Sequence, residues 1–313
     1  MLNDGPIIVT GAAGLVGQNL IAQLKAHPHA HIVGIDKHPA NTRLLSSLNP
    51  GVCVIEADLA KRGAWEDAFQ GAQALVLNHA QIGGVDRQAF VDNSITATQN
   101  VLAAATLHKV PYVVHISSAM VPRAHRDFYT ESKQAQEQLA ISSGIPCCVL
   151  RPTVMFGWFD RKHWAWFARF MARFHFCPIP GHGRYLRQPL YVRDFCRIVI
   201  SCLDQPRPGA IYNISGQETI SYLDLMRAIR DLSNSRAFIV LIPYQIVWLL
   251  LRIVESLSSR PPFTTQQLRA LVSADLSEVI DWPGIFAVHP TPLSSALQET
   301  FQHPIYSKVE LES

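Results

Sequence analysis

Three glycines near the N-terminus constrain the fold of this chain more than any other feature. Thr10–Gly17 reads TGAAGLVG and directly follows a short apolar run, so we expect it to join a strand to a helix. In such a turn Gly11 permits the tight bend, Gly14 lets backbone approach a pyrophosphate, and Gly17 lets helix and strand pack closely. The helix N-terminus then offers N–H groups to phosphates. The pattern predicts a dinucleotide site, with a ligand-free strand–helix turn as the alternative.

Short apolar runs alternate with longer amphipathic stretches through the first half of the chain. The runs are apolar or β-branched throughout, as in strands that are buried on both faces of a parallel sheet. The expected strands are Pro6–Thr10, His31–Asp36, Val52–Glu56, Ala74–Asn78, Tyr112–Ser117 and Cys147–Leu150. Helical stretches such as Leu15–Ala26 and Ser94–His108 lie between them. These repeated units predict an α/β fold with a Rossmann-type, doubly wound parallel sheet.

The alternation of strand and helix loosens after about residue 151, which indicates a second part of the molecule. We expect residues 1–155 to form a NAD(P)-binding Rossmann domain, with later segments near 189–204 returning to it. Residues 156–313 are expected to form mainly a smaller, C-terminal substrate-binding lobe. Ligands of such sheets collect at the carboxyl ends of the strands.

Composition excludes several classes of protein. Hydrophobic residues make up 48% and charged residues 16% of the chain, which is typical of a globular protein. The formal net charge of +3 is too small to indicate a nucleic-acid partner on its own, and we expect no nucleic acid but a small-molecule substrate. The six cysteines make no CxxC pair and no zinc-like spacing with histidine, so no metal is expected. Without a recognisable secretion signal, we expect a cytoplasmic protein.

Two apolar segments in the second half raise the question of a membrane. Ala237–Leu251 is nearly all apolar but shorter than the roughly 20 residues that a spanning helix needs. We expect a buried strand, turn and helix there, with a helix inserted into a membrane surface as the alternative. His163–Phe176 is an aromatic helix whose residues 163, 167, 170 and 174 follow helical spacing, which predicts a stripe that faces the core.

Basic residues are interleaved with the rings of this aromatic helix: Arg161, Lys162, Arg169 and Arg173. Two tryptophans, Trp164 and Trp166, lie outside the predicted stripe. This combination leaves two alternatives to core packing, which are peripheral contact with a membrane surface and an apolar pocket for a lipid-like substrate.

An acidic residue follows the glycine motif at an informative distance. Asp36 ends the second predicted strand, about 20 residues past the motif, where a carboxylate binds the adenosine ribose hydroxyls. Such a carboxylate repels a 2′-phosphate and favours NAD over NADP. Lys37 and Arg43 keep NADP open, because a nearby cation can hold that phosphate. Asp58 follows the third strand and is expected either to contact the adenine or to cap a helix.

A tyrosine and a lysine four residues apart predict a proton-transfer pair. Phe128–Lys133 reads FYTESK at the start of an expected helix, so Tyr129 and Lys133 share one face. A lysine cation beside a tyrosine hydroxyl, whose pKa is ordinarily about 10, favours the phenolate. Tyr129 then acts as base for an alcohol or as acid for a carbonyl. The Ser117–Ser118 pair ends the preceding strand and is expected to orient the reacting oxygen. The alternative is a solvated helix face.

These motifs resemble those of the extended short-chain dehydrogenases/reductases, in the NAD-dependent epimerase/dehydratase family. TGAAGLVG resembles the cofactor fingerprint, HISSAMV the serine strand, YTESK the Tyr–Lys motif and RPTVMFG the Arg-Pro strand, so the resemblance covers most of the chain. YVRDF resembles the family's Val-x-Asp segment, with Asp194. The resemblance implies that Ser118, Tyr129 and Lys133 are catalytic, with Lys133 also at the nicotinamide ribose. It also implies that Asn93 supports the active site at the cofactor.

The resemblance implies an oxidoreductase or isomerase that acts on a nucleotide-activated sugar, as an epimerase, a dehydratase or a dehydrogenase. Arg187 is placed like the arginine that binds the substrate diphosphate in sugar-nucleotide epimerases, with a surface arginine as the alternative. A homodimer is also implied, because helices beside the active site form dimer bundles in many members.

Two departures keep other functions open. Val154 stands where sugar-nucleotide enzymes usually carry asparagine, which favours an enzyme similar to 3β-hydroxysteroid dehydrogenase that acts on a lipid or lipid-linked alcohol. PIPGHGRYLRQPLYV and VHPTPLSSAL resemble a branch that includes the nucleotide-binding accessory subunit of respiratory complex I. A non-catalytic NAD(P)H-binding subunit is therefore a further alternative.

Overall fold

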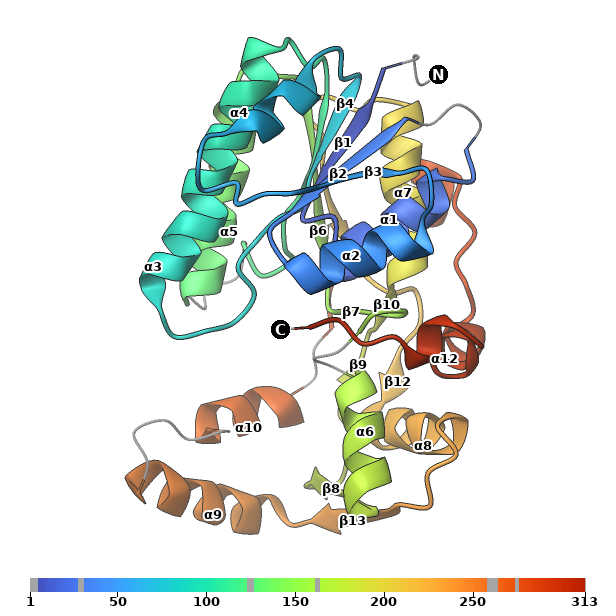
Figure 1. The fold of residues 1–313 in the computed structure, drawn as a ribbon. Helices are drawn as coiled ribbons and strands as arrows, with labels where there is room; N and C mark the ends of the chain where they lie inside the picture. Colours follow the sequence, from blue (N-terminus) through green and yellow to red (C-terminus); the bar gives the residue numbers. More distant parts are fainter. Residues whose placement is uncertain are drawn as a thin grey trace.

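The chain folds into a helix-flanked sheet with a smaller lobe attached at one end (Figure 1). The structure is a computed structural model that describes residues 5–27, 31–122, 127–160, 164–257, 264–273 and 276–312. Arg161, Lys162 and His163, which belong to the expected aromatic helix, lie outside the described residues. The two parts are joined by several crossings of the chain rather than by one linker (Figure 1).

The central sheet has seven strands, all parallel, in the order β11-β6-β5-β4-β1-β2-β3. Their bounds are β1 Ile7–Thr10, β2 Ile32–Asp36, β3 Cys53–Glu56, β4 Ala74–Leu77, β5 Val113–Ile116, β6 Cys147–Pro152 and β11 Ile211–Ile214. All six strands predicted in the first half are therefore confirmed. β11 also joins this sheet, although it comes from beyond the segment expected to return. The strand order reverses between β1 and β4, where a ligand crevice opens in sheets of this kind.

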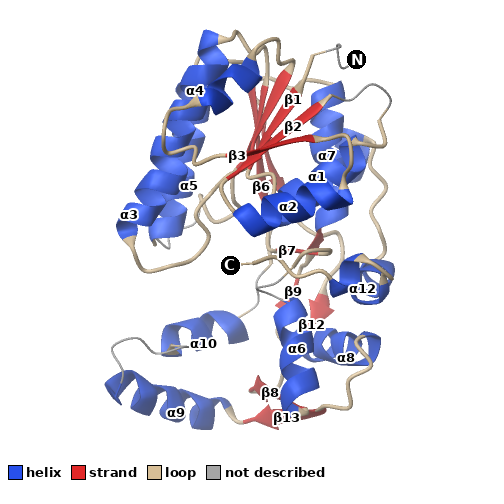
Figure 2. Ribbon diagram, viewed as in Figure 1, coloured by secondary structure: helices blue, strands red, loops and turns tan. Residues whose placement is uncertain are grey.

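Helices cover both faces of the sheet. One face carries α1, α2 and α7, and the other carries α4, α5 and the short helix η1 (Figures 1 and 2). The bounds are α1 Leu15–Leu24, α2 Pro39–Leu48, η1 Ala64–Phe69, α3 Arg87–Phe90, η2 Val91–Thr96, α4 Ala97–Leu107, α5 Phe128–Ser142 and α7 Val192–Asp204. Alternate residues of β1 point to opposite faces, so Ile7 and Val9 pack under α1 and α7 while Ile8 packs under α4. The inner strands β1, β2, β4 and β5 are buried along their whole length, which explains their uninterrupted apolar runs, whereas the edge strand β3 is partly exposed.

The lobe is built from short strand pairs and helices around its own apolar cluster. Its strands are β7 Met155–Phe156, β8 Phe176–Pro180, β9 Leu186–Arg187, β10 Leu190–Tyr191, β12 Ile220–Ser221 and β13 Phe238–Ile242. Its helices are α6 Trp164–Phe174, α8 Tyr222–Leu232, α9 Tyr244–Leu257, α10 Thr265–Val272 and α12 Leu293–Gln302, while α11 Trp282–Phe286 packs beside α7. A final helical turn, η3, spans Tyr306–Lys308. β13 and α9 lie at the end of the molecule that is far from the sheet (Figure 1).

The expected stripe of the aromatic helix is only partly right. Phe167 packs against the apolar cluster of the lobe, as expected, but the buried side chains of α6 are Trp164 and Met171, and Phe174 of the expected stripe is 51% exposed. Phe170 is half-buried and in ring contact with the exposed Trp166. Large apolar residues occur on more than one side of this helix, so periodicity does not identify which side meets the core.

The segment 237–251 forms the expected strand, turn and helix but not in the expected environment. β13 and α9 surround Pro243, yet none of the described side chains of α9 is buried. The prediction of burial is therefore wrong, because α9 contacts α10 along one side and no described element covers the other. Within the described ranges, no helix combines the length and apolarity that crossing a membrane requires.

Candidate active site

The three glycines in the turn between β1 and α1 differ in their steric surroundings. Gly11 has φ +64°, and a Cβ there would lie 2.8 Å from the Cα of His79. A Cβ on Gly17 would lie 2.4 Å from the carbonyl oxygen of Gly11. A Cβ on Gly14 would meet only the Gly11 carbonyl oxygen, at an ordinary 3.5 Å. Two of the glycines are therefore required by the fold, and Gly14 leaves open space at the start of α1.

This open space suits a phosphate. Gly14 is the N-cap of α1 and provides no side chain to cap the first amides, which are left for a ligand. A helix N-terminus favours anions through these amides and its dipole. The cradle that a Cβ at Gly14 would fill therefore fits the pyrophosphate of a dinucleotide.

Asp36 closes the turn from the end of β2. Its carboxylate is buried and accepts the amide of Ala13 at 3.0 Å and the amide of His38 at 3.1 Å. Each carboxylate oxygen has a second lone pair, so both can also accept a ribose hydroxyl. The residues present therefore fit an NAD-type adenosine.

Polar side chains near Asp36 form hydrogen bonds with one another. Lys37 Nζ donates to Asn93 Oδ1 at 2.7 Å, and Asn93 Nδ2 donates to Gln81 Oε1 at 2.8 Å. Asn93 belongs to η2, a π-helical stretch of the kind often found at functional sites. The Asp58 carboxylate accepts the Ala60 amide and lies 3.6 Å from Lys61. The structure thus brings Asn93 to Lys37, and it holds Asp58 in a local turn.

Tyr129 and Lys133 lie on one face of α5, beside the end of β5. Ser118 is hydrogen-bonded to the Tyr129 hydroxyl and also accepts the amide of Met120 at 3.2 Å. Lys133 is buried and donates from Nζ to the carbonyl oxygen of Ile116, the last residue of β5, at 2.8 Å. The three residues that were predicted to be catalytic are therefore brought together by one strand end and one helix face.

The electrostatics of this group follow from its burial. Loss of hydration raises the pKa of Tyr129, while the hydrogen bond from Ser118 lowers it. Burial lowers the pKa of Lys133 to about 7, and the carboxylate of Glu137 acts in the opposite direction. Tyr129 is therefore a protonated acid at neutral pH, and Lys133 is poised between its charged and neutral forms.

A buried acid beneath the pair was missed in the sequence. Glu137 is 1% exposed, accepts the Ser117 hydroxyl at 2.6 Å and forms an ion pair with Arg151 of β6. It lies four residues after Lys133, which extends the spacing from Tyr129 to Lys133 by one more turn. That spacing was the signal in the sequence by which Glu137 could have been found. Its carboxylate raises the pKa of Lys133 and so favours the charged form of the lysine.

A second buried network, also missed, joins the glycine turn to α5. His79 Nδ1 lies 2.9 Å from Thr10 Oγ1, and its Nε2 lies 3.2 Å from Thr98 Oγ1. Gln136 of α5 donates to Thr98 Oγ1 at 2.8 Å and to the His79 carbonyl oxygen at 3.0 Å. Burial, with a smaller contribution from Lys133, lowers the pKa of His79 to about 3. These contacts between neutral groups link the glycine turn after β1 to α5, the helix that carries Tyr129 and Lys133.

Arg187 is held within the lobe. Its Nη1 donates to the carbonyl oxygen of Ser273 at 2.7 Å, and its Nη2 donates to that of Leu271. The guanidinium also lies over the Tyr185 ring, 4.9 Å from its centroid. The side chain therefore connects β9 to the C-terminal end of α10.

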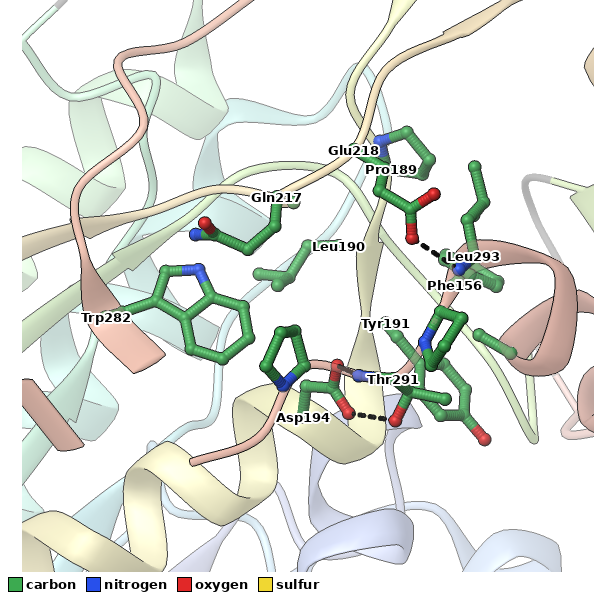
Figure 3. Close-up of a pocket in the computed structure, with 14 residues that line it drawn as sticks. Phe156, Pro189, Leu190, Tyr191, Asp194, Gln217, Glu218, Trp282, Thr291 and Leu293 are labelled. Carbon is green, nitrogen blue, oxygen red and sulfur yellow. Dashed lines mark hydrogen bonds between the residues drawn. The ribbon is translucent and has the colours of Figure 1, made fainter. Parts of the chain in front are cut away.

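A cavity of about 210 Å³ lies at the start of α7, with mainly apolar walls (Figure 3). Its two carboxylates are occupied, since Asp194 accepts the hydroxyl and amide of Thr291 and Glu218 accepts the amide of Leu293. None of the residues predicted to be catalytic lines it. Asp194 thus fastens α7 to the loop before α12.

The fold and this group of residues define a class of protein. A parallel sheet with a glycine turn closed by Asp36, and a Tyr129–Lys133 pair across the crevice, are typical of the extended short-chain dehydrogenases/reductases. The family model described as the NAD dependent epimerase/dehydratase family matches residues 7–215. The chain belongs to this family, whose members are enzymes.

Relatives and solved structures are similar to the chain along most of its length. A dTDP-glucose 4,6-dehydratase from Actinoplanes sp. is 26% identical over 265 residues, which cover 74% of this chain and 82% of the relative. A 3β-hydroxysteroid dehydrogenase/Δ5→4-isomerase from Mycobacterium tuberculosis is 24% identical over 74% of this chain and 70% of its own. UDP-glucuronic acid 4-epimerase from Bacillus cereus, solved with UDP-glucuronic acid and NAD, is 25% identical with a TM-score of 0.72, covering 95% of this chain and 98% of its own.

Proposed function

We propose that this chain is an NAD-dependent enzyme that changes a hydroxyl-bearing carbon of a nucleotide-activated sugar, with Tyr129 as its proton-transfer residue. The observation that carries the proposal is the buried Lys133, which donates to the end of β5 from the same face of α5 as Tyr129, with Ser118 just after that strand end. Similarity to a dTDP-glucose dehydratase and to a UDP-glucuronic acid epimerase supports the substrate class.

The protein residues supply proton transfer and orientation. We propose that Ser118 holds the reacting oxygen against the Tyr129 hydroxyl, so that the proton moves along one hydrogen bond; the influence of Ser118 on Tyr129 supports this role. Because burial keeps Tyr129 protonated, donation of a proton to a carbonyl is the direct step. Abstraction from an alcohol needs added positive charge, and we assign that role to the ammonium form of Lys133, one turn further along α5. NAD, when bound, supplies the hydride chemistry.

We further propose that Gly14 and Asp36 bind the cofactor pyrophosphate and adenosine ribose, with Lys133 near the nicotinamide ribose. NAD is favoured over NADP because Asp36 stands at the ribose position and Lys37 is engaged by Asn93. Arg187 is the proposed cation for the substrate diphosphate. Since its Nη atoms now donate to carbonyls at the end of α10, a diphosphate would compete with those contacts.

A second candidate function is oxidation of an apolar alcohol. Similarity to a hydroxysteroid dehydrogenase supports it, as does Val154, whose side chain is 46% exposed and apolar. In this case Tyr129 would take the proton of the alcohol, and NADH would accumulate.

The test uses purified protein with NAD and two panels, one of UDP-, dTDP- and GDP-sugars and one of sterols and lipid-linked alcohols. Products and nicotinamide absorbance are followed for wild type, Tyr129→Phe and a control, Tyr212→Phe, which removes a half-buried hydroxyl on β11. We expect sugar turnover that falls at least roughly 100-fold in Tyr129→Phe, as for the loss of a general acid, with NAD binding retained.

Turnover confined to the apolar panel would favour the second candidate. Measurable NAD binding with no turnover in either panel would contradict both, and would identify a non-catalytic nucleotide-binding subunit. Equal turnover by wild type and Tyr129→Phe would remove Tyr129 from the mechanism.

A further inference from the structure

The exposed side of α9 is apolar, where a surface helix of a globular protein is normally polar. Five of its side chains lie on one face and are 48% to 82% exposed: Ile246, Leu250, Ile253 and Leu257, at spacings of four, three and four residues, and Leu249, three residues after Ile246. We call this set the α9 stripe. Tyr244, Trp248 and Leu251 are half-buried on the opposite side, where α9 meets α10. The stripe therefore points away from the rest of the lobe.

A second exposed apolar group lies at the same end of the molecule. Phe176 of β8 and Phe238 of β13 are register partners, and they are 43% and 75% exposed. Phe174, at the end of α6, is 51% exposed. Figure 2 shows β8, β13 and α9 together at the end of the lobe that is farthest from the sheet. Such a concentration of exposed apolar side chains marks an interaction surface.

The charges around this surface are mostly positive. Among the described residues of β8, β13, α9, α10 and their immediate flanks, the acid is Glu255, which lies 3.6 Å from Arg252 and accepts the Thr265 amide at 2.6 Å. The exposed arginines there are Arg173, Arg236, Arg252 and Arg269. Arg252 and Arg269 line one groove between α9 and α10, together with Trp248. This arrangement presents cations beside the α9 stripe.

We infer that this end of the lobe docks onto the surface of an anionic lipid bilayer, with the α9 stripe inserted at the level of the headgroups. A helix with an apolar face flanked by arginine and tryptophan is the composition that lies in a membrane interface. Anionic headgroups match Arg252 and Arg269. With 14 residues, α9 is too short to cross the bilayer and lies along it.

Charge disfavours a second copy of the chain as the occupant. A two-fold interface places the same patch on both sides, so these arginines would face arginines with few acids to pair them. A bilayer that contains anionic lipid supplies the opposite charge and an apolar layer at once.

The test is flotation of the full chain with vesicles of phosphatidylcholine alone, or of equal parts phosphatidylcholine and phosphatidylglycerol. We expect wild type to float with the mixed vesicles and to bind less at high salt. Combined Ile246→Gln, Leu250→Gln and Ile253→Gln should weaken the partition coefficient on the order of 100-fold, because each inserted aliphatic side chain contributes roughly a factor of five. Combined Arg252→Gln and Arg269→Gln should remove the preference for phosphatidylglycerol.

Leu107→Gln is the matched control, since this side chain is 68% exposed on α4, in the other part of the molecule, and should float like wild type. The Tyr129→Phe protein should also float normally, so this test is independent of the proposed catalysis. Absence of flotation by wild type, or flotation that survives the triple substitution, would overturn the inference. A fall in oligomeric mass on triple substitution without any change in flotation would assign the surface to a second copy.

Discussion

Ser117 and Ser118 are adjacent, yet their hydroxyls serve different partners. Neighbouring side chains of an extended backbone point in opposite directions. Ser117 reaches the buried Glu137, whereas Ser118 reaches Tyr129. The Ser117 hydroxyl donates to Glu137, which also forms an ion pair with Arg151, so Ser117 has a structural partner. The family resemblance implied Ser118 for the proton-transfer site, and the different partners of the two hydroxyls support that prediction.

His79 connects acid stability to the cofactor turn. Its folded pKa is about 3, lowered mainly by burial, against an ordinary 6.5, so the unfolded chain binds one more proton between these values. Stability that is present above about pH 6.5 is therefore lost as the pH falls toward 3, at about 1.4 kcal/mol per pH unit for this proton. In His79→Gln, the free energy of unfolding should depend less on pH over this range, by about 1.4 kcal/mol per pH unit.

The measurement is the free energy of unfolding by urea at several pH values between 4 and 7. The control is His289→Gln, which replaces an exposed histidine. A limb of equal slope in wild type and His79→Gln would show that His79 is protonated in the folded protein.

At the scale of one element, the β1–α1 turn contains one glycine that the fold requires, Gly17, and one that we propose NAD binding requires, Gly14. Gly17→Ala places a Cβ 2.4 Å from backbone oxygen, so we expect a loss of about 1–3 kcal/mol in the free energy of unfolding. Gly14→Ala meets only an ordinary contact and should change stability by less than about 1 kcal/mol. It should nevertheless weaken NAD binding at least roughly tenfold, because the Cβ occupies the proposed pyrophosphate space.

Thermal unfolding and NAD titration of the two variants test this separation. Gly144→Ala, in an exposed turn with open space but with φ +78°, serves as the control for glycine substitution away from the site. Normal NAD affinity in a folded Gly14→Ala protein would place the pyrophosphate elsewhere.

The elements show what the sequence could predict. The parallel strands were predictable because burial on both faces requires unbroken apolar runs, and the glycine turn was predictable because its spacing has a steric cause. The exposure of α9 was not, since an apolar run carries no information on whether another element covers it. Glu137 and His79 were missed because their partners come from distant parts of the chain.

At the scale of the whole molecule, Arg187 lies between the two surfaces discussed above. It contacts the end of α10, and α10 in turn packs against α9. The proposed diphosphate site and the proposed membrane surface therefore share one helix. A ligand that drew Arg187 away from the carbonyls of Leu271 and Ser273 would loosen α10.

Arg187→Gln should loosen α10 in the absence of any substrate. Two charge-assisted hydrogen bonds are lost, which at this partly exposed site corresponds to about 1–2 kcal/mol of local stability and roughly tenfold faster amide exchange over residues 264–273. Arg184→Gln, which changes an exposed arginine on the same segment, should leave that exchange unchanged. If UDP binding to wild type also speeds exchange in 264–273, the diphosphate competes for Arg187. If UDP slows the exchange, Arg187 contacts the diphosphate and the α10 carbonyl oxygens at the same time. If exchange is the same in wild type and Arg187→Gln, Arg187 does not hold α10 in place.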